Sequence, residues 1–263
     1  MNEKNLEYLQ EQIKYTGFGN DLAAELKENI MKNSETFTLN HQAAYGNDQT
    51  KAELYFSKSM QSDMYFFNAY KVTLQKDNAP QMEQTFYINK GNNITLKEAY
   101  NLMNGRAINK NLMNKEGDIY NTWIQMDFKQ THENGNHKLK HYHENYGYDL
   151  EGSLAKHPIK ELENPDYKEN IMDSIKKGNR QSVTFTINGE DHKRYVEANP
   201  KFKAINIYNG NKVRLEAKQK EKLSNSQSKS TKKENKLDAN SKDLGDDNSS
   251  NTKKIRRRKA KSI

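Results

Sequence analysis

Residues Lys176–Pro200, KKGNRQSVTFTINGEDHKRYVEANP, contain the pattern from which the fold can be inferred. A helical segment ends at Lys177-Gly178, an alternating strand pattern follows, and Asn188-Gly189 predicts a tight hairpin turn before a second strand. A glycine next to an arginine also suggests a loop that holds an anion. Because Gly178 follows a helix and precedes a strand, no helix N-terminus lies there to attract an anion, and we interpret the glycine as a helix cap.

The same order of elements occurs three times along the chain. Glycine and asparagine tolerate the left-handed backbone that helix ends and tight turns require. Such residues mark both places in every copy: helix ends at Asn33-Ser34, Asn104-Gly105 and Lys177-Gly178, and turns at Gly46-Asn47, Glu116-Gly117 and Asn188-Gly189. We therefore predict three divergent helix-strand-strand repeats, each with an apolar face that it cannot bury alone. The expected fold is α+β, in which the units share one antiparallel sheet system packed against helices on one side.

The remaining periodicity predicts helices over 2–15, 21–33, 94–105 and 166–178, and one or two short helices over 149–165 broken by Pro158. Met64–Tyr70, MYFFNAY, is apolar on both strand faces. It therefore predicts a central strand covered on both sides rather than an aromatic platform for nucleic-acid bases. We expect two domains and a tail: 1–92 with the first unit and an extra hairpin, 93–215 with the other two units, and 216–263.

Charge and aromatic content divide the chain at residue 216. All 25 aromatic residues precede this position, so only the body can bury a sizeable core. The segment Glu216–Ile263 carries 12 lysines, 3 arginines and 7 acidic residues, a net charge of +8 that equals the formal charge of the whole chain. It is rich in lysine and serine and poor in apolar residues, so we predict that it is disordered.

The end of this tail, KKIRRRKAK, is predicted to contact DNA or RNA without sequence preference. Dense positive charge releases counterions from a phosphate backbone, and no aromatic residue is present there for base stacking. A solubilising tail, or a protein or membrane-surface partner, remains the alternative. The predicted nucleic-acid-binding residues are Lys253, Lys254, Arg256, Arg257, Arg258, Lys259 and Lys261.

Cysteine is absent, so disulfides and cysteine-based zinc sites are excluded. No apolar run approaches the roughly 20 residues of a membrane span, so no membrane insertion is expected. The first residues, MNEKNLEYLQ, lack the apolar region of a signal peptide. Together these features lead us to expect a cytoplasmic protein.

Two groups of residues are candidates for sites of chemistry. His137, His141 and His143 fall close together, and on a strand they would share a face that could ligate a metal. Because neither a zincin helix pattern nor a cysteine partner accompanies them, no metal site is predicted. Carboxylates also occur on or beside strands, without any sequence feature that pairs them: Asp63, Glu83, Asp118, Asp127 and Glu197. No phosphate loop or dinucleotide fingerprint is present, so no cofactor is expected.

Several stretches carry a family resemblance, among them TFYINKGNNITLKEAYNLMNGRAINK, EGDIYNTWIQMDF, NYGYDLEGSL and EANPKFKAINIY. They are similar to conserved proteins encoded on conjugative and mobilisable elements of Bacteroidetes bacteria. The repeated unit resembles the domain of unknown function family 3945. This likeness covers residues 2–215 and rests on the whole pattern rather than on a catalytic motif. It implies a mobile-element setting and assigns neither an activity nor a site residue.

These features lead us to expect a non-enzymatic accessory protein of a mobile genetic element. Its body would bind a protein partner, and its tail would hold it near nucleic acid. Two other classes stay open. One is a metal-dependent enzyme acting on nucleic acid, and the other is a protein-interaction module or inhibitor that does not bind nucleic acid.

Overall fold

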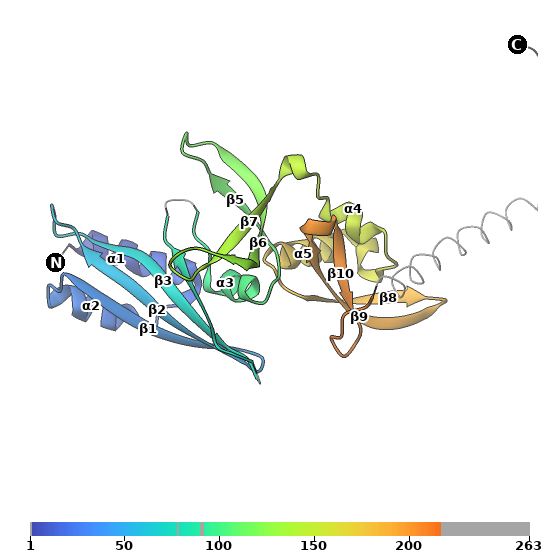
Figure 1. The fold of residues 1–263 in the computed structure, drawn as a ribbon, viewed down its shortest axis with the longest axis horizontal. Helices are drawn as coiled ribbons and strands as arrows, with labels where there is room; N and C mark the ends of the chain where they lie inside the picture. The colour runs from blue at the N-terminus through green and yellow to red at the C-terminus, as the bar shows by residue number, and fades with distance from the viewer. Residues whose placement is uncertain (1, 78, 90–91, 217–263) are drawn as a thin grey trace, which may run out of the picture.

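The computed structural model describes residues 2–77, 79–89 and 92–216. Five α-helices and ten strands are found in these ranges, and the strands form three separate antiparallel sheets. The sheets follow one another along the long axis of the molecule in chain order (Figure 1). None of the helices in the described ranges has the length and apolar character needed to span a lipid bilayer.

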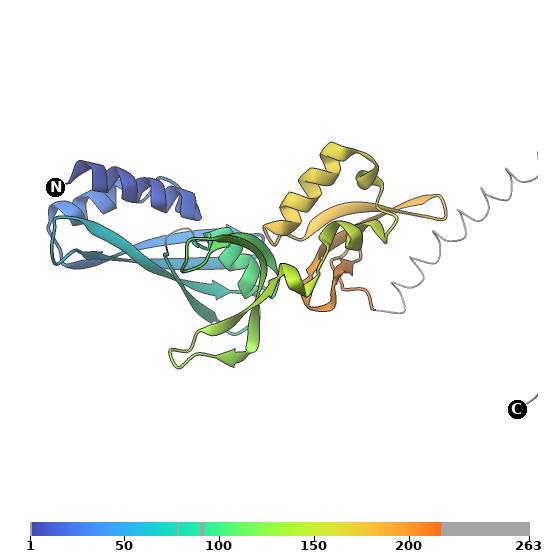
Figure 2. The ribbon, with the colours of Figure 1, turned by 90° about the horizontal axis from the view of Figure 1, so that it is seen from above.

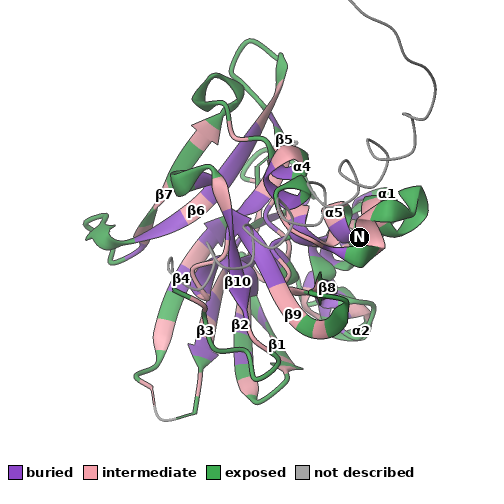
Figure 3. Cartoon of the chain, turned by 90° about the vertical axis from the view of Figure 1, so that its right-hand side faces the viewer, coloured by how far each residue is buried: buried purple, intermediate pink, exposed green. Residues whose placement is uncertain are grey.

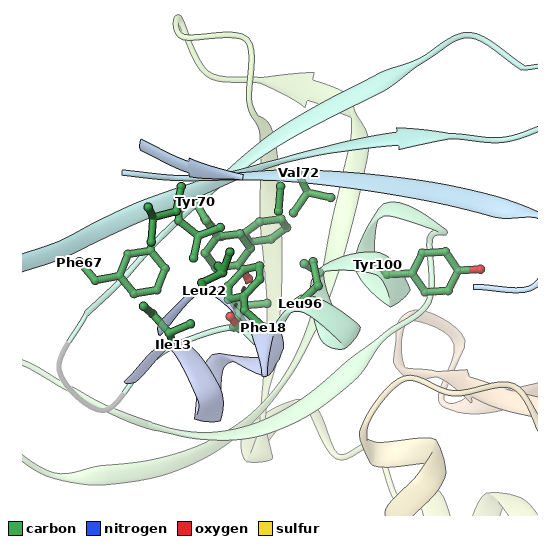
Figure 4. Packing of buried hydrophobic residues seen from close by; sticks show 14 of the residues in the cluster. Ile13, Phe18, Leu22, Phe67, Tyr70, Val72, Leu96 and Tyr100 are labelled. Atoms are coloured by element: carbon green, nitrogen blue, oxygen red, sulfur yellow. Dashed lines mark hydrogen bonds between the residues drawn. The ribbon is translucent and has the colours of Figure 1, made fainter. Parts of the chain in front are cut away.

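The first sheet has four strands in the order β1-β2-β3-β4, namely β1 Thr36–Tyr45, β2 Asp48–Lys58, β3 Tyr65–Gln75 and β4 Met82–Tyr87. Helix α1, Glu3–Ile13, continues as a π-helical turn through Phe18, and α2 is Ala23–Met31. Both helices lie on the same side of this sheet (Figure 2). Phe18 meets the buried ring of Tyr70 at a centroid distance of 5.2 Å (Figure 4).

The second sheet belongs to the middle repeat and has the order β5-β6-β7. Its strands are β5 Ile108–Met113, β6 Ile119–Thr131 and β7 His137–His143. Helix α3, Leu96–Met103, precedes it and begins at a capping box in which Thr95 and Glu98 exchange hydrogen bonds. This helix packs between the first and second sheets, because it contacts β3 and β4 as well as β5 and β6.

The third sheet has the order β10-β9-β8, with strands β8 Gln181–Ile187, β9 Glu190–Asn199 and β10 Ala204–Tyr208. Helices α4, Leu150–Ala155, and α5, Pro165–Lys176, pack on one of its faces. A 3₁₀ turn, Lys160–Glu163, lies between these helices beyond Pro158, where the sequence predicts a break. Helix α5 also contacts β5, so it lies at the junction of the second and third sheets.

The repeat predicted from sequence is present, with one addition. The three helix ends reach a left-handed residue whose N–H donates to the carbonyl three residues earlier: Asn33 at φ 59°, Gly105 at φ 76° and Gly178 at φ 81°. The three turns contain Gly46, Gly117 and Gly189, all with positive φ. Every sheet extends beyond the strand pair of its repeat, by β3 and β4 in the first, which form the expected extra hairpin, by β7 in the second and by β10 in the third. The expectation of one shared sheet system is wrong, since every unit closes a sheet of its own.

Two buried clusters form the core, and strand β6 contributes to both. Ile124 and Met126 on one face of β6 join the cluster under the first sheet, whereas Trp123 on the other face joins the cluster around the third sheet. Figure 3 shows β6 buried along its middle and exposed toward its ends. The first cluster contains residues from both sides of the predicted domain boundary between 92 and 93, from Leu6 to Met126. That boundary stays a prediction.

Gly178 lies at the centre of the junction between the second and third units. The side-chain amide of Asn101, fully buried on α3, donates to the carbonyl of Lys177 at 2.6 Å and so closes the end of α5. A Cβ atom on Gly178 would come within 2.8 Å of Ile108 Cγ2 and 2.9 Å of Asn101 Cβ. The glycine next to Arg180 is therefore a helix cap packed against its neighbours, and not a ligand loop.

The prediction for Met64–Tyr70 is partly wrong. Strand β3 is central, and Tyr65 and Phe67 are buried beneath the helices as expected. Phe66 and Met64 are exposed, however, at 47% and 39%. The helices cover only one face of the first sheet, so the apolar side chains on the other face meet solvent.

Candidate nucleic-acid interface

The tail residues predicted to bind nucleic acid, from Lys253 to Lys261, lie outside the described residues, as does the predicted disorder of this segment. The last described residue is Glu216. Immediately before it, the backbone of Arg214 forms an isolated antiparallel β-bridge with that of Tyr208, and the N–H of Leu215 donates to the carbonyl of Ile207 at 2.8 Å. The chain therefore enters the tail alongside strand β10.

The two faces of the third sheet differ sharply in chemistry. Val196, Ile205 and Ile207 lie in the core beneath α4 and α5. The alternate residues of β9 and β10 point to the opposite face, where Tyr195 pairs with Tyr208 and Glu197 pairs with Asn206. None of these four residues belongs to either buried apolar cluster of the described chain.

Glu197 is the centre of a buried polar network on this face. Its carboxylate accepts hydrogen bonds from Arg180 Nε at 3.2 Å, from Asn206 Nδ2 at 3.0 Å and from the Tyr208 hydroxyl. Burial, followed by the bond to Glu197, raises the pKa of Tyr208 to about 12, so this hydroxyl stays protonated and donating. The Arg180 guanidinium lies over the Tyr208 ring at 3.9 Å, where Glu197 neutralises its charge.

Three cations without a carboxylate partner in the described chain surround this network. Arg214 Nη2 donates to Asn206 Oδ1 at 2.6 Å, and the side chain is otherwise exposed. The ammonium groups of Lys193 and Lys212 lie 5.5 Å and 5.6 Å from the centre of the Tyr195 ring. We call this surface the basic face, defined by Arg180, Lys193, Tyr195, Tyr208, Lys212 and Arg214.

A second group of cations and rings adjoins the basic face at the 3₁₀ turn Pro200–Phe202. Phe202 is 68% exposed, and Lys201 Nζ lies 5.3 Å from its ring centre. Lys203 Nζ lies 4.9 Å from the ring of Tyr146, whose hydroxyl donates to the carbonyl of Lys201 at 2.7 Å. A groove of about 580 Å³ is lined by Phe202, Arg214 and Glu216.

A charge count over the whole body does not reveal this basic surface. Residues 193–215 contain six cations and one carboxylate, a net charge of +5, while the body as a whole is neutral. The single carboxylate is Glu197, which is buried and paired with Arg180. A charge count in a short sliding window would have found the segment, but not the face on which its side chains meet.

The histidines do not converge as a metal site. The His141 and His143 rings are neighbours on β7 at 5.9 Å, whereas His137 packs against the edge of Phe128 at 5.2 Å. Burial, and then the proximity of His143, lower the pKa of His141, so this side chain is neutral near pH 7. Nowhere in residues 2–77, 79–89 and 92–216 do three or more histidine, aspartate or glutamate side chains gather to hold a metal ion.

The carboxylates considered from sequence each have a partner of their own. Asp127 pairs with Lys140 at 2.7 Å, and Asp63 pairs with Lys58 at 3.1 Å. Glu83 contacts Lys71, Asp118 contacts Asn114, and Glu197 contacts Arg180. This arrangement resembles charge pairing on sheet surfaces, and none of these contacts joins two of the five as an acid–base pair.

A pocket of about 380 Å³ lies between α4, α5 and the turn after Pro158. Leu154, Ile159 and Met172 give it an apolar floor. The rim is charged, with Glu151 and Lys168 joined as an ion pair across the two helices. An apolar floor with a rim of both charges suits a hydrophobic side chain of a protein partner better than a charged small molecule.

Comparison of the chain with family models, curated proteins and solved structures finds no match. The resemblance to the mobile-element family therefore stays a prediction.

Proposed function

We propose that this chain is a non-enzymatic accessory protein of a mobile genetic element that binds nucleic acid through its basic C-terminal region and works in the cytoplasm. Two surfaces contribute positive charge, the tail cations from Lys253 to Lys261 and the basic face of the third sheet. The connection between them supports the proposal, since residues Arg214 and Leu215, which pair with strand β10, lead directly into the tail segment that begins at Glu216.

The basic face is the observation on which the proposal depends most. Apart from Arg180, which pairs with Glu197, its cations are arranged over aromatic rings and amides instead of opposite carboxylates, so their charge is available to phosphate groups. Contacts of this kind bind the backbone of any nucleic acid, and they position it without reading its sequence. The expected binding is therefore salt-dependent and independent of sequence.

The test is a mobility-shift titration of the full chain with duplex DNA at a series of salt concentrations. A matched variant replaces the seven tail cations with glutamine and leaves residues 1–252 unchanged. We expect wild-type affinity to fall steeply with salt, and the variant to lose about 5–6 units of the slope of log K against log salt if most of these cations contact phosphates. Absence of binding by the wild-type chain, or binding insensitive to salt, would contradict the proposal.

A second function, contact with a protein partner, is supported by the pocket between α4 and α5. We propose that an apolar side chain of the partner occupies its floor, with the charged rim setting orientation. The test compares native host proteins retained by the wild-type chain and by Met172→Glu, after circular dichroism has established that the variant is folded. A partner retained equally by both proteins would show that this pocket is not the contact.

A further inference from the structure

Resting on the nucleic-acid binding proposed above, we infer that the body recognises single-stranded nucleic acid, with a base stacked on Phe202 and the adjoining phosphates held by Lys201, Lys203 and Arg214. The inference concerns the type of strand that is bound, which the tail cations alone would not discriminate. It depends on an exposed ring, on the charges around it and on the groove beside it.

Phe202 is presented to solvent by the local backbone. The turn Pro200–Phe202 closes with a hydrogen bond from the N–H of Lys203 to the carbonyl of Pro200 at 3.0 Å, and Lys203 adopts a left-handed conformation at φ 47°. The reversal of the chain at this point leaves the Phe202 side chain outside both buried clusters. A phenylalanine that contributes to neither core is available for stacking.

The charged side chains that lie against the rings at this turn are both cations. Lys201 lies against Phe202 and Lys203 against Tyr146, so two rings and two ammonium groups meet at one turn. Arg214 lines the same groove as Phe202, with Glu216 as the acidic residue of this lining. Alternation of rings and cations is the arrangement that binds single strands, in which bases stack on aromatic side chains and cations follow the phosphates.

A duplex cannot use Phe202 in this way because its bases already stack on one another and present only their edges. An acidic protein segment is the competing occupant, since it would satisfy the cations while leaving the ring with little to gain. A single-stranded nucleotide uses both features, because its base stacks on the ring and its phosphate pairs with the cations. We therefore favour single-stranded nucleic acid as the ligand.

The experiment measures fluorescence anisotropy of labelled oligothymidine and of a labelled duplex of equal length with the full chain. Phe202→Ala is compared with Phe202→Trp and with Phe66→Ala, a matched control at another exposed phenylalanine, on the open face of the first sheet. The same substitutions are also made in the variant with the seven glutamines in the tail, so that weak binding by the body is not hidden. Thermal unfolding verifies that each protein is folded.

We expect Phe202→Ala to weaken binding to oligothymidine by about five-fold or more, and binding to the duplex by less than about two-fold. Phe202→Trp should retain the affinity for the single strand, and Phe66→Ala should alter neither ligand. Salt-dependent binding that Phe202→Ala leaves unchanged, or that it weakens equally for both ligands, would overturn this inference alone. Displacement of oligothymidine by polyglutamate at equal charge concentration would likewise assign the surface to an acidic protein. Failure of the wild-type chain to bind either nucleic acid would remove the proposed function itself.

Discussion

Replacement of Gly178 by alanine should destabilise the protein far more than the same change at a turn glycine. Two costs add at this position. An L-residue at φ 81° is held in the left-handed region, which costs about 1–2 kcal/mol. The new methyl group also comes within 2.8 Å of Ile108 Cγ2 and 2.9 Å of Asn101 Cβ, and overpacking of this kind costs roughly 1–3 kcal/mol.

One effect opposes these costs. Alanine restricts the unfolded chain more than glycine does, which returns about 0.4–1 kcal/mol. The expected loss for Gly178→Ala is therefore about 2–4 kcal/mol. Gly189→Ala is the matched control, because Gly189 has a similar φ of 85° while a Cβ atom there would meet no other atom within 4 Å. It should lose about 1 kcal/mol or less.

The assay is equilibrium unfolding in urea, followed by the fluorescence of Trp123, the only tryptophan of the chain, and by circular dichroism. Trp123 is a suitable probe because it lies in the second buried cluster and pairs across the sheet with Asn109, the neighbour of Ile108. A double-mutant cycle with Ile108→Ala isolates the steric part, since removal of the contacting methyl should make Gly178→Ala less costly. Equal losses for Gly178→Ala and Gly189→Ala would refute the close packing at Gly178.

Further predictions concern the same junction, the histidines and catalysis. Asn101→Leu should cost roughly 2–4 kcal/mol, because it leaves the carbonyl that ends α5 and the guanidinium of Arg106 without their buried partner; urea unfolding measures this loss, and a cost under about 1 kcal/mol would contradict it. Burial lowers the pKa of His41 and of His141, so the folded chain binds protons less readily than the unfolded chain. Protonation of these two histidines therefore favours the unfolded chain. The free energy of unfolding is highest above the ordinary histidine pKa and should decrease as pH falls from about 7 to about 5. His141→Asn should flatten this decrease when urea unfolding is repeated across this pH range; a pH profile equal to that of the wild-type chain would exclude the effect. Incubation of labelled DNA or RNA with the protein and Mg²⁺ or Mn²⁺ should give no cleavage, whereas metal-dependent cleavage abolished by His141→Asn would establish the enzymatic alternative.

Local features of the sequence allowed much of the fold to be predicted. Helix ends and turns depend on which residues accept a left-handed backbone, and glycine at 178 or Asn188-Gly189 satisfies that requirement with little help from distant contacts. The α+β class and the order of elements followed from these positions. The number of sheets did not, because strand patterns indicate that strands pair but not where a sheet ends.

The candidate interface was harder to predict for the same reason. The exposure of Phe66 depends on which face of the first sheet the helices cover. The sequence does not indicate that face, because both faces of β3 carry aromatic residues. The positive charge of residues 193–215 is present in the sequence, yet its meaning depends on pairing. Only the fold buries Glu197 against Arg180 and leaves Arg214 facing solvent.

The order of the residues was enough to establish the positions of the chain reversals, the α+β class, the three-fold repetition and the concentration of positive charge at the C-terminal end. These properties are local, since each depends on a residue's own backbone preference or charge. Three-dimensional packing was needed to establish that the units close separate sheets, that Gly178 and Asn101 meet at their junction, and that cations and rings from separate segments of the third unit share one face. Such arrangements arise from contacts between segments far apart in the chain, where the burial of apolar surface selects one arrangement among several that local preferences allow.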